Sequence, residues 1–416
     1  MEKKNRDYLA IAIPAVVLFF LTSKLVLTDV EYVLSDYNGH IRVYLPMFAP
    51  EHWTNGWMAV PYCLWHVCTL LIHNVLRIPV ENAAGICSGL FAVFGYFVTY
   101  WMAQCTVKSV RGEENSTKLA LVAFGLSVVQ PLYFAWLNAG NRYLGPFSPN
   151  PMHNPTQMCV RGFSLLCFCL VVDLWGANRD AAYRGIFFKV ENGAKKYYLY
   201  LAVVLLLSTI AKPTFAETFI PAVGFLMLGE WIAKLVRKAP DAGKYFKSCL
   251  TMLGCAVPAL AYILVQFLAY FIWGGSYGSD GGLILTKPFE VWSLFTENVI
   301  LSVALGMAFP ILMILMDAQY YLRTDSGRLA LASYAIGFAE AALLGESGIK
   351  LSHADFIWPM MSGMLLMWTV CTLRLLILEH TNSRTKTQQC FIAGAWFVFV
   401  VHVIYGFAYL AEKFAG

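Results

Sequence analysis

The sequence predicts an all-α polytopic membrane protein, and three observations support this prediction. Of the 416 residues, 59% are hydrophobic and only 13% are charged, whereas about 25% of the residues of a soluble domain are charged. The mean hydropathy is +0.60. The charged residues gather in short segments between long apolar runs. A lipid environment accounts for this pattern, because it allows most of the protein surface to be apolar.

A helix needs about 20 apolar residues to cross the hydrocarbon core of a bilayer. The runs that meet or approach this length are residues 8–28, 57–76, 83–104, 118–137, 156–176, 197–211, 213–233, 248–273, 292–316, 328–344, 356–378 and 390–411. The first run follows "MEKKNR" and lacks a small-residue cleavage site, which favours a retained helix over a signal peptide. These runs predict about 11–13 transmembrane helices in a single transmembrane domain, residues 1–416, without a separate soluble domain.

Lysine and arginine set the expected orientation, because they are enriched in the cytoplasmic loops of membrane proteins. The segments 177–196 and 234–247 are rich in both residues, and the N-terminus is also basic. We therefore expect a multi-pass protein of the cell membrane whose N-terminus is cytoplasmic. The extracytoplasmic segments are then a first loop at 29–56 and further outer loops at 138–155, 274–291 and 345–355.

One segment conflicts with this alternation. Loop 105–117 carries Lys108 and Arg111 and is expected in the cytoplasm, yet two full crossings between residues 57 and 104 would place it outside. We therefore expect residues 57–82 to be re-entrant or interfacial, because non-helical backbone at membrane depth must be buried in protein or line a cavity.

The cysteines and the familiar motifs of soluble enzymes give no further site. Most of the eleven cysteines lie in apolar runs, where cysteine behaves as a small hydrophobic residue. The sequence contains no P-loop, no Gly-rich dinucleotide motif and no HExxH. We expect no cofactor and no metal site, although a divalent cation is left open. Functional residues are therefore sought in the outer loops and among the polar groups near the membrane.

Two stretches near the predicted outer side carry unusual polar residues. "VLSDYNGHIRVYL", residues 33–45, holds Asp36 and His40. "LGPFSPNPMHNPTQMCVRG", residues 144–162, precedes a helix that places Arg161 near its N-terminal end. The N-terminal end of a helix dipole is unfavourable for a cation and favourable for an anion. A cation kept at this position therefore indicates an anion-binding site, such as one for phosphate. The alternatives are that Asp36 caps a helix and that Arg161 extends to lipid headgroups.

Two later stretches lie on the same predicted side. "STIAKPTFAETFIPA" places Lys212 between two apolar runs and Glu217 one turn into the second. An ionised side chain inside a membrane should be paired or face an aqueous cavity, so these two residues form either a structural pair or part of a site. "LLGESGIKLSHADFIWPMMSG" contains His353 and Asp355, which either cap the following helix or close over a site.

A long first outer loop with an Asp soon after the first span, followed by many helices with polar outer loops, resembles the GT-C superfamily of membrane glycosyltransferases. "VPYCLWHVCTLLIHNVLRIPVENAAG" resembles the segment after the first loop in bacterial members. "HNPTQMCVRGF", "AKPTF" and "ADFIW" are similar to blocks of uncharacterised bacterial proteins of this type. The first-loop acid is often paired in the superfamily, whereas "SDYNGH" has one Asp, which argues against a metal-using version.

The resemblance implies an enzyme with a GT-C-like fold that transfers a hexosyl or pentosyl group from a polyprenyl-phosphate donor. The acceptor would be an extracytoplasmic glycan, lipid or protein in cell surface polysaccharide assembly. The partners would be this donor, the acceptor and membrane lipids, with no nucleic acid. Asp36 would be the catalytic base. The substrate-binding residues would be His40, His66, His153, Asn154, Arg161, Lys212, Glu217, His353 and Asp355, with Arg161 and Lys212 beside the phosphate.

Two other functional classes fit part of the pattern. A polysaccharide polymerase would also place Arg and His on the outer side. Such a protein usually has one large outer loop in the C-terminal part of the chain, whereas the outer loops there are short in this sequence. A transporter or flippase of a lipid-linked or small polar substrate would need charges near the middle of its spans, and Glu340 in "GFAEAALL" is such a charge. An accessory membrane subunit without catalytic activity is a further class.

Overall fold

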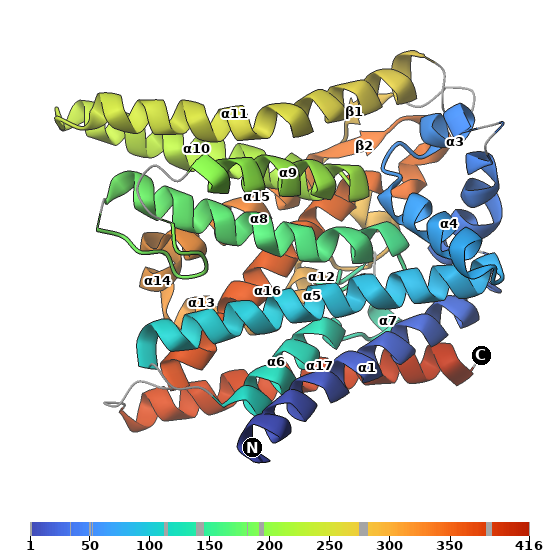
Figure 1. The fold of residues 1–416 in the computed structure, drawn as a ribbon, viewed down its shortest axis with the longest axis horizontal. Coiled ribbons are helices and arrows are strands. Elements are labelled where there is room, and N and C mark those ends of the chain that lie inside the picture. Colours follow the sequence, from blue (N-terminus) through green and yellow to red (C-terminus); the bar gives the residue numbers. More distant parts are fainter. Residues whose placement is uncertain are drawn as a thin grey trace.

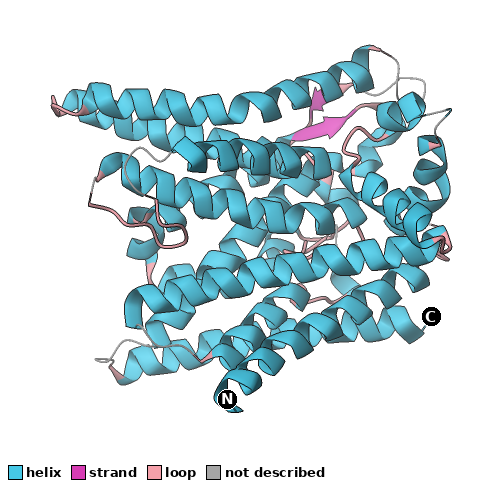
Figure 2. Ribbon diagram, viewed as in Figure 1, coloured by secondary structure: helices cyan, strands magenta, loops and turns pink. Residues whose placement is uncertain are grey.

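The computed structural model describes residues 2–33, 35–49, 51, 53–111, 115–138, 145–180, 182–190, 195–273, 282–379 and 385–415. These residues form a bundle of helices whose long members lie side by side (Figure 1). Strands are confined, among the described residues, to β1 (Leu283–Leu285) and β2 (Leu344–Glu346), which pair antiparallel at one end of the bundle (Figure 2). The predicted all-α class is confirmed.

Seven helices of the described chain are long and apolar enough to cross a membrane. They are α1 (Glu2–Asp29), α5 (Val80–Arg111), α8 (Pro155–Arg179), α10 (Thr214–Val236), α11 (Ala242–Phe267), α16 (Trp358–Glu379) and α17 (Lys386–Ala415). The pair α12 (Val299–Gly306) and α13 (Ala308–Met316), bent by 73°, makes an eighth if it forms one span. The protein is therefore a multi-pass membrane protein.

Four of the predicted spans form helices that are shorter or more polar than a typical crossing. They are α4 (Leu64–Leu76), α6 (Ser116–Val128), α9 (Lys195–Ala211) and α15 (Asp325–Leu343). α4 and α6 have 13 residues each, or about 20 Å at 1.5 Å per residue. The seven or eight spans identified by length and composition are thus fewer than the expected 11–13. Crossing by α6, α9 and α15 stays a prediction, as does the re-entrant or interfacial placement of residues 57–82, which include α4.

The remaining elements are short. They are α2 (Asp36–Asn38), α3 (Trp53–Ala59), α7 (Ala135–Asn138) and α14 (Ala318–Arg323), with π or 3-10 turns at Gly39–Tyr44, Leu45–Phe48, Leu268–Ile272, Trp292–Leu294, Gly348–His353 and Asp355–Ile357. Residues 34, 50 and 52 of the first predicted outer loop, 139–144 of the second and 274–281 of the third lie outside the described residues.

Burial separates the central helices from those that face lipid. In the apolar windows of α8 and α16, 89% and 83% of the residues are buried inside the protein, compared with 17% in α10 and 22% in α11. Large apolar side chains of the latter two, such as Phe225 and Leu264, are exposed. A lipid environment is what makes such an exposed apolar surface stable. α8 and α16 are therefore the core of the bundle.

Close backbone contact holds the central pair α15 and α16 together. A Cβ atom added at Gly337 of α15 would lie 2.6 Å from Cα of Met360, and one added at Gly363 of α16 would lie 2.6 Å from Cα of Tyr334. Small residues allow helices to approach in this way in a membrane, where packing rather than the hydrophobic effect drives their association.

The end of α1 marks the end of the bundle at which the candidate site lies, here called the Asp29 end. Lys413, near the C-terminus, donates a hydrogen bond to Asp29 Oδ1 over 2.6 Å. α3, α4 and the two strands lie at this same end (Figure 1). Since α4 spans less than the roughly 30 Å hydrocarbon core, its length agrees with the expectation that residues 57–82 do not cross fully.

Candidate functional site

Asp36 begins a short helix just beyond the end of α1. Ser35 is the N-cap of this helix, since its hydroxyl oxygen accepts a hydrogen bond from the Asn38 backbone N–H over 3.0 Å. The Ser35 hydroxyl in turn donates to the Asp29 carbonyl. The cap of α2 is therefore Ser35 and not Asp36, and the Asp36 carboxylate is directed to other partners.

Those partners come from the Pro-rich segment before α8. Asn154 Nδ2 donates a hydrogen bond to Asp36 Oδ2 over 2.8 Å, and His153 Nε2 lies 3.7 Å from the same oxygen. The Asp36 side chain sits deep among the surrounding helices yet keeps 36% of its surface accessible.

Asn154 connects Asp36 to Lys212. Its Oδ1 atom caps α8 by accepting a hydrogen bond from the Gln157 backbone N–H over 2.9 Å, and it also accepts from Thr156 Oγ1 over 2.8 Å. Lys212 Nζ donates to the same oxygen over 3.4 Å. The Asn154 side chain therefore binds Asp36 through its amide nitrogen and Lys212 through its amide oxygen. The same oxygen caps the N-terminus of α8.

Lys212 is a buried cation between α9 and α10, with 6% of its surface exposed. Its Nζ atom lies 4.4 Å from the ring centroid of Trp358 and 5.6 Å from that of Tyr62, within the range of cation–π attraction. Burial lowers the pKa of Lys212 to about 8, while the charges of Asp36, Asp355 and Glu217 act in the opposite direction. The ammonium group thus has three acidic neighbours.

A cavity of about 270 Å³ adjoins Lys212. Its polar lining includes Lys212, Glu217, Glu346 and Asp355, and its apolar and aromatic lining comes from Pro61, Tyr62, Pro213, Ile263, Phe267, Leu283, Phe356 and Trp358. Thr214 and Gln266 complete the wall. A mainly apolar wall with a few converging charged groups is the usual composition of a ligand site.

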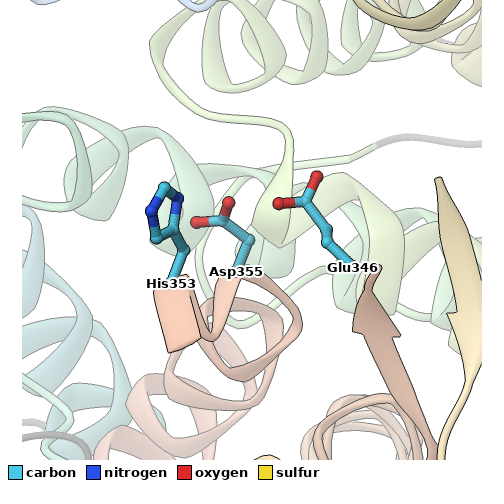
Figure 3. Close-up of side chains that lie close together, drawn as sticks. All are labelled: Glu346, His353 and Asp355. Carbon is cyan, nitrogen blue, oxygen red and sulfur yellow. The ribbon is translucent and has the colours of Figure 1, made fainter. Parts of the chain in front are cut away.

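Two of the lining residues, Glu346 and Asp355, form a cluster with His353. Glu346 ends β2, while His353 and Asp355 flank Ala354, whose φ of 58° turns the chain sharply. One potential ligand atom from each of Glu346, His353 and Asp355 lies within 4.8 Å of the others, and the two carboxylates face one another (Figure 3). The predicted site did not include Glu346, which reaches the cavity through the pairing of β2 with β1.

His40 and His66 form a separate buried pair. His40 Nδ1 lies 3.0 Å from His66 Nε2, and the His66 ring stacks on Phe48 with centroids 5.3 Å apart. Burial, followed by the neighbouring His66, lowers the pKa of His40 well below its ordinary value. The described partner of His40 is thus His66 rather than Asp36, and substrate binding by this pair stays a prediction.

Arg161 is directed toward the protein core. It is 4% exposed, its Nη2 atom donates to the Leu126 carbonyl over 3.0 Å, and its Nη1 atom donates to Asn150 Oδ1. It lies seven positions after Asn154, about 10 Å along the helix axis. These contacts fix the loop around Asn150. The phosphate contact predicted for Arg161 stays a prediction, and its burial does not fit the alternative of extension to headgroups.

The protonation states of the site follow from burial. Burial raises the pKa of Asp36 above its ordinary value, although the Lys212 charge and the Asn154 hydrogen bond lower it. Burial lowers the pKa of His153 to about 3, so the imidazole is neutral at pH 7. The cation that accompanies Asp36 is therefore Lys212. A carboxylate with a raised pKa is suited to accept a proton near neutral pH.

No protein-family model, no curated protein and no solved structure matches this chain.

Proposed function

We propose that this protein is a GT-C type membrane glycosyltransferase that moves a sugar from a polyprenyl-phosphate donor to an acceptor in cell-surface glycan assembly. The observation that carries the proposal is the convergence of Asp36 and Lys212, linked through Asn154 beside a mainly apolar cavity. A general base and a buried cation are the two groups that transfer from a lipid phosphate requires.

In the proposed reaction, the bond between the anomeric carbon of the sugar and a phosphate oxygen breaks, and a bond from that carbon to the acceptor oxygen forms. Asp36 takes the proton of the acceptor hydroxyl, and the bonding electrons leave with the phosphate. Lys212 stabilises the charge that develops on the phosphate, and its burial strengthens this effect because little water competes for the ammonium. Polyprenyl phosphate is the second product.

The cavity wall suits the lipid part of the donor. Ile263 and Phe267 of α11 line the cavity, and α11 exposes most of its apolar surface at the outside of the bundle. A polyprenyl chain lying in the membrane can therefore reach the cavity along α11 while its phosphate meets Lys212. Charge patterning supports an extracytoplasmic location of the end that holds the cavity. The basic segments 177–196 and 234–247 follow the far ends of α8 and α10, and basic segments are typical of the cytoplasmic side.

The test uses purified protein in sealed proteoliposomes that contain a donor lipid with a labelled sugar and a cell-derived glycan extract as acceptor. We expect label to move from the lipid fraction into acceptor, with release of polyprenyl phosphate in equal amount. The Asp36→Asn variant should release neither product while remaining folded. Absence of transfer by the wild-type protein with donor and acceptor present would contradict the proposal.

A transporter is the second candidate, and one observation favours it. The pair α12 and α13 is broken by a 73° bend, and broken helices are common in transporters. The same proteoliposomes separate the two functions. A transporter would carry intact labelled lipid or solute across the bilayer without splitting the sugar–phosphate bond, whereas the proposed enzyme splits that bond on one side.

A further inference from the structure

We propose that Glu346, His353 and Asp355 bind a divalent cation, Mn²⁺ or Zn²⁺, at the edge of the Lys212 cavity. The three residues offer one imidazole nitrogen and two carboxylate oxygens. Imidazole is a common ligand of Zn²⁺, and carboxylates suit Mn²⁺, so the mixed set favours these ions over Ca²⁺ and Mg²⁺, which prefer oxygen ligands alone.

The spacing of the ligand atoms fits one ion. Two ligands of a single cation can be separated by at most twice the metal–ligand distance, which is about 4–4.5 Å for bonds near 2.0–2.2 Å. The three candidate atoms all lie within 4.8 Å of one another, so rotamer adjustments of a few tenths of an ångström bring them around a common centre. Figure 3 shows the three side chains side by side, with Asp355 between His353 and Glu346.

The state of Glu346 points independently to a ligand. This residue is 5% exposed, and its Oε2 atom has no hydrogen-bond partner within the described part of the chain. A buried acceptor without a partner is strongly unfavourable, particularly when it carries charge. The Glu346 and Asp355 carboxyl groups also lie within hydrogen-bond reach of each other, and the Glu346 carboxyl is turned toward Asp355 (Figure 3). A bound cation would satisfy the remaining oxygen and be shared by both carboxylates.

The charge balance of the cavity leads to the same ion. Glu217, Glu346 and Asp355 line the cavity together with Lys212. Outside the lining, Asp36 acts on Lys212 and Lys350 acts on Glu346, so four carboxyl groups face two lysines. Carboxylates in excess of cations repel one another at low dielectric, and they also repel a phosphate. A divalent cation held by Glu346 and Asp355 offsets this excess.

The role of the ion rests on the proposed glycosyl transfer. Three protein ligands leave further coordination positions, as in catalytic metal sites, where substrate or water completes the shell. Such positions would face the cavity beside Lys212. The ion would then bind a phosphate oxygen of the donor and share with Lys212 the stabilisation of the departing phosphate.

The test measures metal binding directly and does not depend on catalysis. Full-length protein in detergent is freed of metal with a chelator, and Mn²⁺ is titrated while free Mn²⁺ is followed by electron paramagnetic resonance. Zn²⁺ is then added as a competitor. We expect one saturable site per chain. Glu346→Gln, Asp355→Asn and His353→Gln should each weaken Mn²⁺ binding at least about tenfold, since even substitutions outside the ligand shell weaken metal sites by that amount.

Glu31→Gln is the matched control, because Glu31 lies at the same end but its side chain is 73% exposed. It should bind Mn²⁺ as the wild type does. Each variant is checked for folding by size-exclusion chromatography and thermal unfolding. The proposal is overturned if folded wild-type protein has no saturable site, or if all three folded variants bind Mn²⁺ with unchanged affinity.

The outcome is separable from that of the proposed function. Saturable Mn²⁺ binding lost in the three variants supports the cation site even if no sugar transfer is found, in which case the transferase proposal fails alone. Sugar transfer by protein that binds neither Mn²⁺ nor Zn²⁺ would overturn the cation site and leave the transferase proposal standing.

Discussion

The substitution Asp36→Asn tests the proposed catalytic base with little change in shape. Asn is nearly isosteric with Asp, and its amide oxygen can accept the hydrogen bond that Asn154 Nδ2 donates to Asp36 Oδ2 over 2.8 Å. The bond changes from charge-assisted to neutral, and the attraction to Lys212 is lost, while a partly buried charge is also removed. We therefore expect the free energy of unfolding to fall by no more than about 1–2 kcal/mol.

The effect on the reaction should be much larger. An amide cannot accept the acceptor's proton, and removal of a general base typically slows a reaction by 10²–10⁴-fold. This range corresponds to about 3–5 kcal/mol in activation free energy. The assay is the initial rate of polyprenyl phosphate release from a labelled donor, measured by mass spectrometry with enough protein to detect a 10⁴-fold decrease.

Two measurements accompany this rate. Thermal unfolding of the purified variant checks that it is folded, and binding of the donor lipid checks that Lys212 still meets the phosphate. Glu31→Gln is again the control, because its exposed pair with Arg42 should contribute little. If folded Asp36→Asn turned over within about threefold of the wild type, Asp36 would not be the base.

Three further predictions follow from other parts of the structure. Transfer should rise with pH through the raised pKa of Asp36, which must be ionised to accept a proton, and fall above pH about 8, where Lys212 loses its charge. Lys212→Arg should move that fall to higher pH, and initial rates between pH 5 and 10 check this. Gly337→Ala places a methyl group 2.6 Å from the α16 backbone and should lower the free energy of unfolding by about 1–3 kcal/mol, whereas Gly254→Ala, with open space around it, should not lower it. Asp173→Ala removes the acceptor of three backbone N–H groups of residues 186–188, so limited proteolysis should cleave this segment faster, and an unchanged cleavage rate would contradict that role.

The helices could be predicted because lipid imposes a simple rule on the sequence. Apolar runs of about 20 residues appear in the structure as helices α1, α5, α8, α10, α11, α16 and α17. The charge conflict at loop 105–117 led to the expectation that residues 57–82 are re-entrant or interfacial. This stays a prediction, with which the 13-residue length of α4 is compatible. The bend between α12 and α13 was not foreseen, because the run 292–316 is apolar throughout its second half.

The site could be predicted only in part. Asp36, His153, Asn154 and Lys212 were expected on one side, and the structure brings them together. Spacing along the sequence does not show which way a side chain points, so it could not show that Arg161 bonds to the loop around Asn150.

Two further features required the fold itself. The pairing of His40 with His66 joins a loop to a later helix over 3.0 Å, and no local pattern indicates such a contact. Glu346 joins the site because β2 pairs with β1 and ends at the cavity. A strand of three residues is too short to leave a periodic signal in the sequence.

The central claim is that the cavity beside Lys212 holds the phosphate of a lipid donor. A cryo-electron microscopy structure of the full-length protein in a lipid nanodisc, with a polyprenyl-phosphate sugar bound to the Asp36→Asn variant, tests it most directly. We expect a phosphate oxygen about 3 Å from Lys212 Nζ, the distance of a charge-assisted hydrogen bond, with the polyprenyl chain leaving along α11. Density for the donor at another place, with the cavity filled by water alone, would contradict the account.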